Sequence, residues 1–94
     1  MKVDFNINYK NLEGVSTDIN IAEQLSMLIS NNPIKGMSAI KLYDIAIKLY
    51  NKTSLELDKE DLVALKRVIE DEFQMATMYK AQLLNIIVDA LNEG

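Results

Sequence analysis

The sequence contains no cysteine and no histidine among its 94 residues. Without cysteine there is no disulfide framework, no thiol nucleophile and no thiolate ligand for a metal. Without histidine the chain lacks the usual proton shuttle at neutral pH, and without either residue it lacks the two commonest zinc ligands. We therefore expect a non-enzymatic protein, with no catalytic residues, no cofactor and no metal site.

Glycine and proline are also scarce, with three and one residues respectively, and 49% of the residues are hydrophobic. This composition indicates one compact domain over residues 1–94 and argues against long disordered tracts. The isolated glycines form no phosphate-binding loop. Because a chain of this length has a small core, it often gains stability by association.

Long hydrophobic runs and basic clusters are missing too. No apolar run approaches the roughly 20 residues of a membrane-spanning helix, and the N-terminal stretch MKVDFNINYK has no signal-peptide pattern. The formal net charge is −4, and the longest basic cluster is Lys66-Arg67. We expect a cytoplasmic protein that binds neither membranes nor nucleic acid directly.

The N-terminal segment has the pattern of a half-buried strand. Hydrophobic and polar residues alternate strictly from residue 2 to residue 9, with Val3, Phe5, Ile7 and Tyr9 on one face. Gly14 suits the turn that follows, and residues 15–19 can return as a second strand. The sequence predicts a β-hairpin over about 2–19, which needs helices to support it.

The remainder predicts about four helices, so that the expected fold is mostly α, with the hairpin packed on a helical bundle. Asn20 and Asp58 are the expected N-caps of the first and third helices. We expect a break between Glu72 and Thr77, because three consecutive carboxylates would crowd the C-terminal end of the third helix. The predicted helices cover about 20–31, 37–51, 58–72 and 75–92.

The second of these helices is apolar around most of its circumference. In residues 38–51 the polar positions fall in a stripe roughly 80° wide. We expect this helix to be the core axis of the monomer, surrounded by the other elements. Tyr43 and Tyr50 are then core tyrosines whose hydroxyls reach the edge; the alternative is a pair of aromatic platforms for a ligand or a base.

The last helix has an apolar arc of roughly 200°, more than one neighbour can cover. We expect its surplus to form a self-association surface, with Tyr79, Leu83, Leu84, Ile87 and Leu91 as the candidates. Lys80 lies on the same arc. It can lay its methylenes along the apolar surface, or it can be the contact for an anionic ligand.

Six acidic residues flank the third helix, and we interpret them mainly as helix caps and a solvated face. Acid catalysis would require a site that raises one carboxyl pKa, which helix ends among polar residues do not provide. The alternative is an acidic surface that binds a basic partner. The candidates for that surface are Asp58, Glu60, Asp61, Glu70, Asp71 and Glu72.

Two segments, LYDIAIKLYNKTSLELDKEDLVALKRVIE and KAQLLNIIVDAL, together resemble a pattern in short uncharacterised proteins of tailed phages and prophages. The resemblance covers mainly residues 40–91, and it departs from the pattern at MATMY, where those proteins have a shorter link that often contains proline. It implies a phage-type origin and a host-cytoplasm location, but it supplies no activity and no site residues.

The leading functional hypothesis is a self-associating protein–protein interaction domain, a small phage-type accessory or assembly protein. Its expected partners are further copies of itself, in a homo-oligomer, and secondarily another protein. One alternative is an acidic inhibitor that occupies the basic nucleic-acid-binding surface of a host defence protein. A further alternative is a binder of a small anionic ligand around Lys80.

Overall fold

The computed structural model describes residues 1–93 and confirms the predicted mostly helical fold with an N-terminal hairpin. Four helices and four short strands occur in this part of the chain. In chain order they are β1 (Lys2–Val3), β2 (Asn8–Lys10), β3 (Ser16–Asn20), α1 (Ile21–Asn31), α2 (Ala39–Tyr50), β4 (Leu55–Glu56), α3 (Lys59–Asp71) and α4 (Thr77–Glu93).

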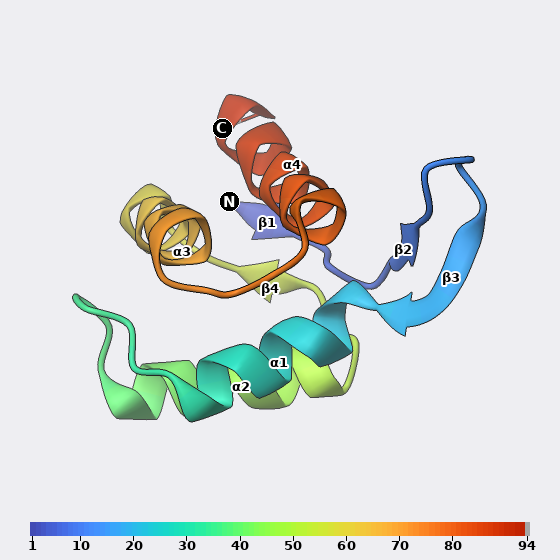
Figure 1. The fold of residues 1–94 in the computed structure, drawn as a ribbon. Coiled ribbons are helices and arrows are strands. Elements are labelled where there is room, and N and C mark those ends of the chain that lie inside the picture. The colour runs from blue at the N-terminus through green and yellow to red at the C-terminus, as the bar shows by residue number, and fades with distance from the viewer. Residues whose placement is uncertain (94) are drawn as a thin grey trace.

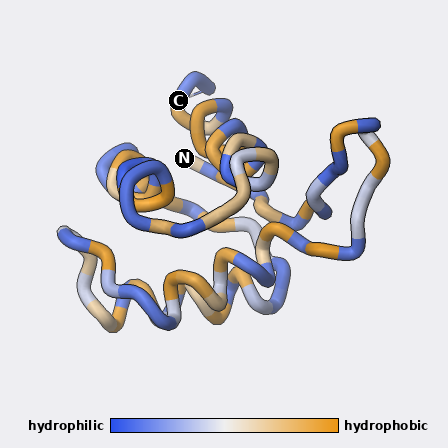
Figure 2. The backbone as a smooth tube through the Cα atoms, in the orientation of Figure 1, coloured by the Kyte–Doolittle hydropathy of each residue, from blue (hydrophilic) through white to orange (hydrophobic). Residues whose placement is uncertain are grey.

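The helices form two layers, with α1 and α2 side by side in one and α3 and α4 in the other (Figure 1). Strands β1 and β4 lie between the layers, and the β2–β3 hairpin projects to one side. Hydrophobic stretches recur along all four helices (Figure 2). One continuous core joins both layers and the strands, and its fully buried members include Phe5, Leu25, Leu49, Leu65 and Leu83.

The N-terminal segment forms two short strands instead of the single predicted strand. β2 pairs antiparallel with β3 as the expected hairpin, whereas β1 pairs antiparallel with β4. A local turn separates them, because the amide of Ile7 donates to the carbonyl of Phe5 at 2.8 Å and the amide of Asn6 donates to Asp4 Oδ1 at 2.8 Å. Ile7 therefore leaves the buried face and is half exposed, while Val3, Phe5 and Tyr9 are buried as expected.

Side-chain caps set the helix starts. Asn20 Oδ1 accepts from the amide of Glu23 at 3.1 Å, and Asp58 Oδ1 accepts from the amide of Asp61 at 2.8 Å, so both predicted N-caps are confirmed. The predicted break is also confirmed, since α3 ends at Asp71 and α4 begins at Thr77. The amide group of Asn20 has a second role: its Nδ2 donates to Asn6 Oδ1 and Asn8 Oδ1, each at 3.1 Å.

The predicted place of residues 38–51 at the core axis is wrong. α2 lies beside α1 in one layer: it packs closely on α1 and touches β4, and one side of it has no cover within the described chain. Its inner stripe is buried, namely Leu42, Ile45, Ala46 and Leu49. A second hydrophobic stripe remains exposed, because four helices in two layers offer this helix only one interior face.

Replacement of Asn20 separates its two roles. We expect Asn20→Ala to lower the free energy of unfolding by about 1–2 kcal/mol, because it removes the helix cap and both side-chain donors. Asn20→Ser keeps a capping oxygen and loses the amide donors without placing an acceptor against Asn6 Oδ1 and Asn8 Oδ1, so its loss is smaller. Chemical denaturation of the two variants beside wild type measures both effects, and an equal loss in the two would contradict a capping role.

Candidate interaction face on α1 and α2

Five large hydrophobic side chains are exposed together on one side of the α1–α2 layer, and we call this set the α1–α2 face. It consists of Met27 from α1, 64% exposed, and of Ile40, Tyr43, Ile47 and Tyr50 from α2, exposed by 85%, 70%, 42% and 65%. Exposed apolar residues scattered singly are ordinary, but a contiguous group of this size is typical of an interaction site.

The four α2 residues of this face follow the spacing of a helix–helix contact. They lie three, four and three positions apart, which is the a/d spacing of two heptads, and we call them the α2 seam. On the helix circumference the seam lies between the buried stripe and the charged stripe that contains Lys41, Asp44 and Lys48. The helix therefore has three sides: a buried one, a charged one and an uncovered hydrophobic one.

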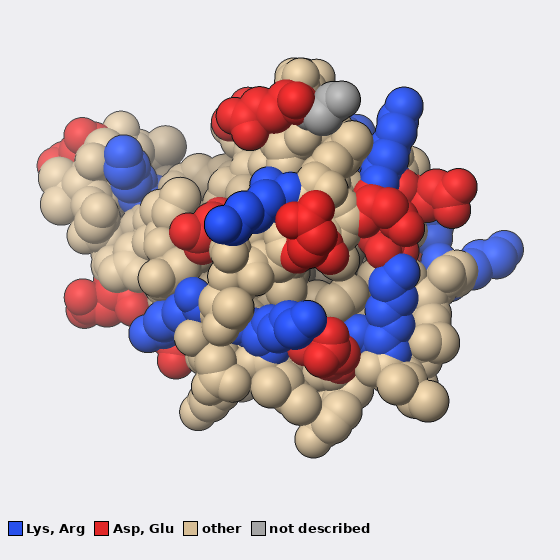
Figure 3. Space-filling model, turned by 180° about the vertical axis from the view of Figure 1, so that it is seen from behind, with Lys and Arg blue, Asp and Glu red and all other residues tan. Residues whose placement is uncertain are grey.

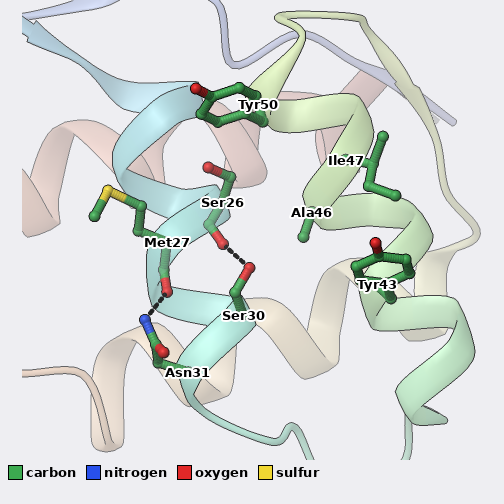
Figure 4. Close-up of a pocket in the computed structure, with 8 residues that line it drawn as sticks. All are labelled: Ser26, Met27, Ser30, Asn31, Tyr43, Ala46, Ile47 and Tyr50. Carbon is green, nitrogen blue, oxygen red and sulfur yellow. Dashed lines mark hydrogen bonds between the residues drawn. The ribbon is translucent and has the colours of Figure 1, made fainter.

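A cavity of about 290 Å³ lies beside the seam, between α1 and α2 (Figure 4). Residues of α1 line one wall and residues of α2 line the other. The lining residues are Ser26, Met27, Ser30 and Asn31 on α1, and Tyr43, Ala46, Ile47 and Tyr50 on α2. We call this cavity the interhelical groove.

The polar side chains on the α1 wall of the groove form hydrogen bonds within α1. Ser26 Oγ donates to the carbonyl of Glu23 at 2.6 Å, Ser30 Oγ donates to the carbonyl of Ser26 at 2.6 Å, and Asn31 Nδ2 donates to the carbonyl of Met27 at 2.9 Å. These bonds use the hydroxyl hydrogens of both serines, whereas the hydroxyls of Tyr43 and Tyr50 lie on the α2 wall. The α1 wall of the groove is therefore suited to contact with hydrophobic side chains.

The groove continues into a hollow at each end. One hollow shares Tyr43 with it and extends toward Pro33 and Met37, and the other shares Tyr50 with it and extends toward Ile19 of β3. Gln24 lines the second hollow, and its Oε1 is buried without a hydrogen-bond partner among residues 1–93. The uncovered surface thus runs along the whole length of α1.

The two seam tyrosines are exposed, so the prediction that they belong to the core is wrong. The buried stripe and the charged stripe occupy the other two sides of α2, so the two tyrosines lie on the third side, which is exposed. Their positions also limit the aromatic-platform alternative, because Tyr43 and Tyr50 are seven residues apart, or about 10.5 Å along the axis. That separation is too long for both rings to stack on one base.

The predicted self-association surface on the last helix is wrong in part. Leu83 and Ile87 are fully buried inside the monomer, so they cannot contact a partner. α3 packs on one side of α4, and β1 and β2 approach another, which covers more of the arc than the sequence predicts. The other three candidates are partly buried against the same core: Tyr79, whose ring centroid lies 4.6 Å from that of Tyr9, together with Leu84 and Leu91.

Lys80 has a structural contact in place of the predicted anion contact. Its Nζ donates to the carbonyl of Glu70 at 3.2 Å, near the C-terminal end of α3. A cation at this position satisfies a carbonyl that has no partner within the helix and interacts favourably with the helix dipole. The Lys80 side chain thus reaches from α4 to α3 with its ammonium group at the edge. This agrees with the first interpretation from the sequence, in which the methylenes lie along the apolar surface.

The acidic residues form two groups at opposite ends of α3, with centres about 17 Å apart at 1.5 Å per residue. At the first end Asp61 is buried and pairs with Lys41 of α2 at 2.6 Å. This hydrogen bond raises the pKa of Lys41, and the capping bond from the amide of Asp61 lowers the pKa of Asp58. Glu60 is exposed in the first turn of the helix.

At the other end Glu70 pairs with Lys66 at 2.9 Å and Glu72 lies 3.7 Å from Arg67, while Asp71 is exposed. Basic and acidic side chains are interspersed on the face seen in Figure 3, and the lowest part of that view is uncharged. The six acidic candidates therefore do not make one continuous acidic surface. Most of them cap a helix or have a basic neighbour.

Comparison with protein-family models, with curated proteins and with solved structures found no match to this chain. Within residues 1–93 no group of three or more acidic side chains is placed to hold a metal ion. Over the same residues, every helix is too short or too polar to cross a membrane. The α1–α2 face is thus the best-defined candidate site in the described chain.

The sequence does contain a signal for this face. The spacing of Ile40, Tyr43, Ile47 and Tyr50 is visible without coordinates, and so is the separate stripe of Leu42, Ile45, Ala46 and Leu49. Treating all eight as one broad apolar surface conceals that they are two stripes. Two stripes of this kind fit a helix that has a partner on each side.

Leu83 and Leu84 are adjacent on α4 but differ in burial, so their replacement by alanine should cost different amounts of stability. We expect Leu83→Ala to lower the free energy of unfolding by about 2–5 kcal/mol, since a fully buried leucine leaves a cavity. Leu84→Ala removes a partly exposed side chain from the same helix, and its cost should be on the order of 1 kcal/mol. Urea denaturation of both variants measures the difference, and equal losses would contradict the placement of α4.

The lowered pKa of Asp58 gives a dependence of stability on pH. The charged cap stabilises the fold above the unfolded pKa of about 3.9, and this contribution disappears as the pH falls through the lower folded pKa. Asp58→Asn keeps a capping side chain without the charge. We expect the difference in melting temperature between wild type and Asp58→Asn to shrink on acidification from about pH 6 to pH 2. A constant difference would show that the charge does not contribute.

Proposed function

We propose that the chain is a non-enzymatic protein–protein interaction domain that associates with itself through the α1–α2 face. The observation that carries the proposal is the α2 seam, four exposed hydrophobic residues with the spacing of a helix–helix contact. Burial of these side chains against a second copy removes apolar surface from water, which is the main favourable term in most protein association.

The size of the face supports an interface with another macromolecule. From their exposed fractions, its five residues present on the order of 500–800 Å² to solvent, taking roughly 150–250 Å² for each large side chain. The largest apolar patch on a typical monomer is about 300–600 Å², and a standard interface buries about 800 Å² on each partner. The face therefore supplies most of what a stable dimer needs.

Charge also favours association at this face. The chain has a net charge of −4, which opposes contact between copies elsewhere on the surface. None of the five residues of the face is charged. The nearest charged residues on α2 are Asp44 and Lys48, which form a salt bridge with 3.0 Å between Lys48 Nζ and Asp44 Oδ2. Two such faces can meet without burying an unpaired charge.

The biological setting that we propose is that of a small phage-type accessory or assembly protein. This part rests on the resemblance of residues 40–91 to short tailed-phage proteins. The acidic-inhibitor alternative has less support, because most of its candidate residues cap α3 or pair with basic neighbours. The anionic-ligand alternative has less support as well, because the ammonium group of Lys80 is engaged by a carbonyl.

Light scattering after size-exclusion chromatography tests the proposal. We expect wild type to be a dimer at micromolar concentrations and Ile47→Glu to be a monomer, because it would place a carboxylate in the middle of the buried seam. Val63→Glu on α3 is the matched control: Val63 is 48% exposed and Ile47 is 42% exposed, but Val63 lies outside the face. This control should remain a dimer.

Two results would contradict the proposal. The first is a wild-type chain that stays monomeric at micromolar concentrations. The second is an equal effect of Ile47→Glu and Val63→Glu, which would show that the face has no special role. Circular dichroism of each variant checks that the helices are retained, so that a loss of association is not a loss of fold.

A further inference from the structure

The α2 seam alternates aliphatic and aromatic side chains along the helix. In order it reads Ile40, Tyr43, Ile47 and Tyr50, all of them exposed. A second α2 helix can lie against the seam in the parallel or the antiparallel direction, and the direction decides which side chains face each other across the interface. We call each set of facing side chains a side-chain layer. The isoleucine and tyrosine side chains differ in size, so the two directions give side-chain layers of different volumes. The order of residues therefore contains information about the geometry of the complex.

Two directions give different layers. In an antiparallel pair centred between residues 43 and 47, Ile40 faces Tyr50 of the other copy and Tyr43 faces Ile47 of the other copy. Every layer then contains one aliphatic and one aromatic residue. In a parallel pair, isoleucine faces isoleucine and tyrosine faces tyrosine, so that small and large layers alternate.

Packing favours the first direction. Facing positions fill the space between helices best when a large side chain lies opposite a smaller one and the layers have similar volumes. An antiparallel pair centred on the seam has a two-fold axis, the symmetry of most homodimers, as a parallel pair in register also has. We propose that two copies pair α2 with α2 in this antiparallel, two-fold arrangement, an inference that rests on the proposed function.

The charges beside the seam form both opposite-charge and like-charge pairs in this arrangement, so its direction rests on the packing of the seam. The two-fold axis places the charged stripes of the two helices on the same side of the interface. At 1.5 Å per residue, Asp44 then lies about 3 Å along the axis from Lys48 of the second copy, and it lies equally close to Asp44 of the second copy. Lys41, the third charge of the stripe, is held by Asp61 of its own chain.

The other side of the seam faces α1. Both tyrosines line the interhelical groove, whose walls include the small residues Ser26, Ser30 and Ala46. The same axis brings the α1 helices of the two copies to this side, with Met27 of each at the rim. The resulting dimer has four helices, in which two phenol rings from each copy cover the groove.

Cysteine cross-linking tests the arrangement, because the chain contains no cysteine and each variant adds a single thiol. We expect a mixture of Ile40→Cys and Tyr50→Cys to form a disulfide-linked heterodimer. Neither variant should cross-link with itself, because identical positions would lie ten residues, or about 15 Å, apart. A disulfide needs Cα atoms roughly 4.4–6.8 Å apart. Oxidation and mass spectrometry of the linked species give the readout.

The control is a mixture of Ile40→Cys and Val63→Cys, which should give only a background of random cross-links. Light scattering shows beforehand whether each variant is still a dimer. If either substitution weakens the dimer, Tyr43→Cys mixed with Ile47→Cys provides the same test, and the mixture should then cross-link faster than either variant alone.

The outcomes separate the two proposals. A dimer in which Ile40→Cys cross-links with itself would be parallel, and a dimer without cross-links at these positions would use another arrangement. Either result would overturn the antiparallel inference and leave self-association intact. A wild-type chain that is monomeric by light scattering would overturn the proposed function and this inference together.

Discussion

The burial of the inner stripe of α2 is the interaction on which the rest of the structure depends. Leu42, Ile45 and Leu49 join the α1–α2 layer to the common core, and α2 has only this one side turned inward. A domain of this size has a small core, so a helix with two hydrophobic stripes cannot bury both. The uncovered second stripe is a direct consequence of that limit.

Several charged residues of this protein join elements or cap them. Lys41 of α2 reaches Asp61 of α3, and Lys80 of α4 reaches the carbonyl of Glu70. Asp58 holds the first turn of α3 through a backbone amide. Most of the charged groups that the sequence offers as binding sites are thus occupied by neighbours within the chain, whereas the uncharged α1–α2 face has no cover among residues 1–93.

The groove beside this face has a similar explanation. Its serines and its asparagine donate to carbonyls of their own helix, so polar side chains line a surface that behaves as apolar. Such a surface discriminates little among polar ligands but accommodates hydrophobic side chains closely. This property, together with the seam, agrees better with a helical protein partner than with a small metabolite.

The sequence by itself determined the helices, the hairpin, the caps at Asn20 and Asp58 and the break before α4, because capping bonds and hydrophobic periodicity act within a few residues. It did not determine which hydrophobic stripe is buried. The eight apolar residues of α2 satisfy the same periodicity whichever side faces inward, and the arc of α4 gives no sign that α3, β1 and β2 cover Leu83 and Ile87. Only the tertiary structure decided this, because burial depends on the shapes of neighbouring elements that come from distant parts of the chain.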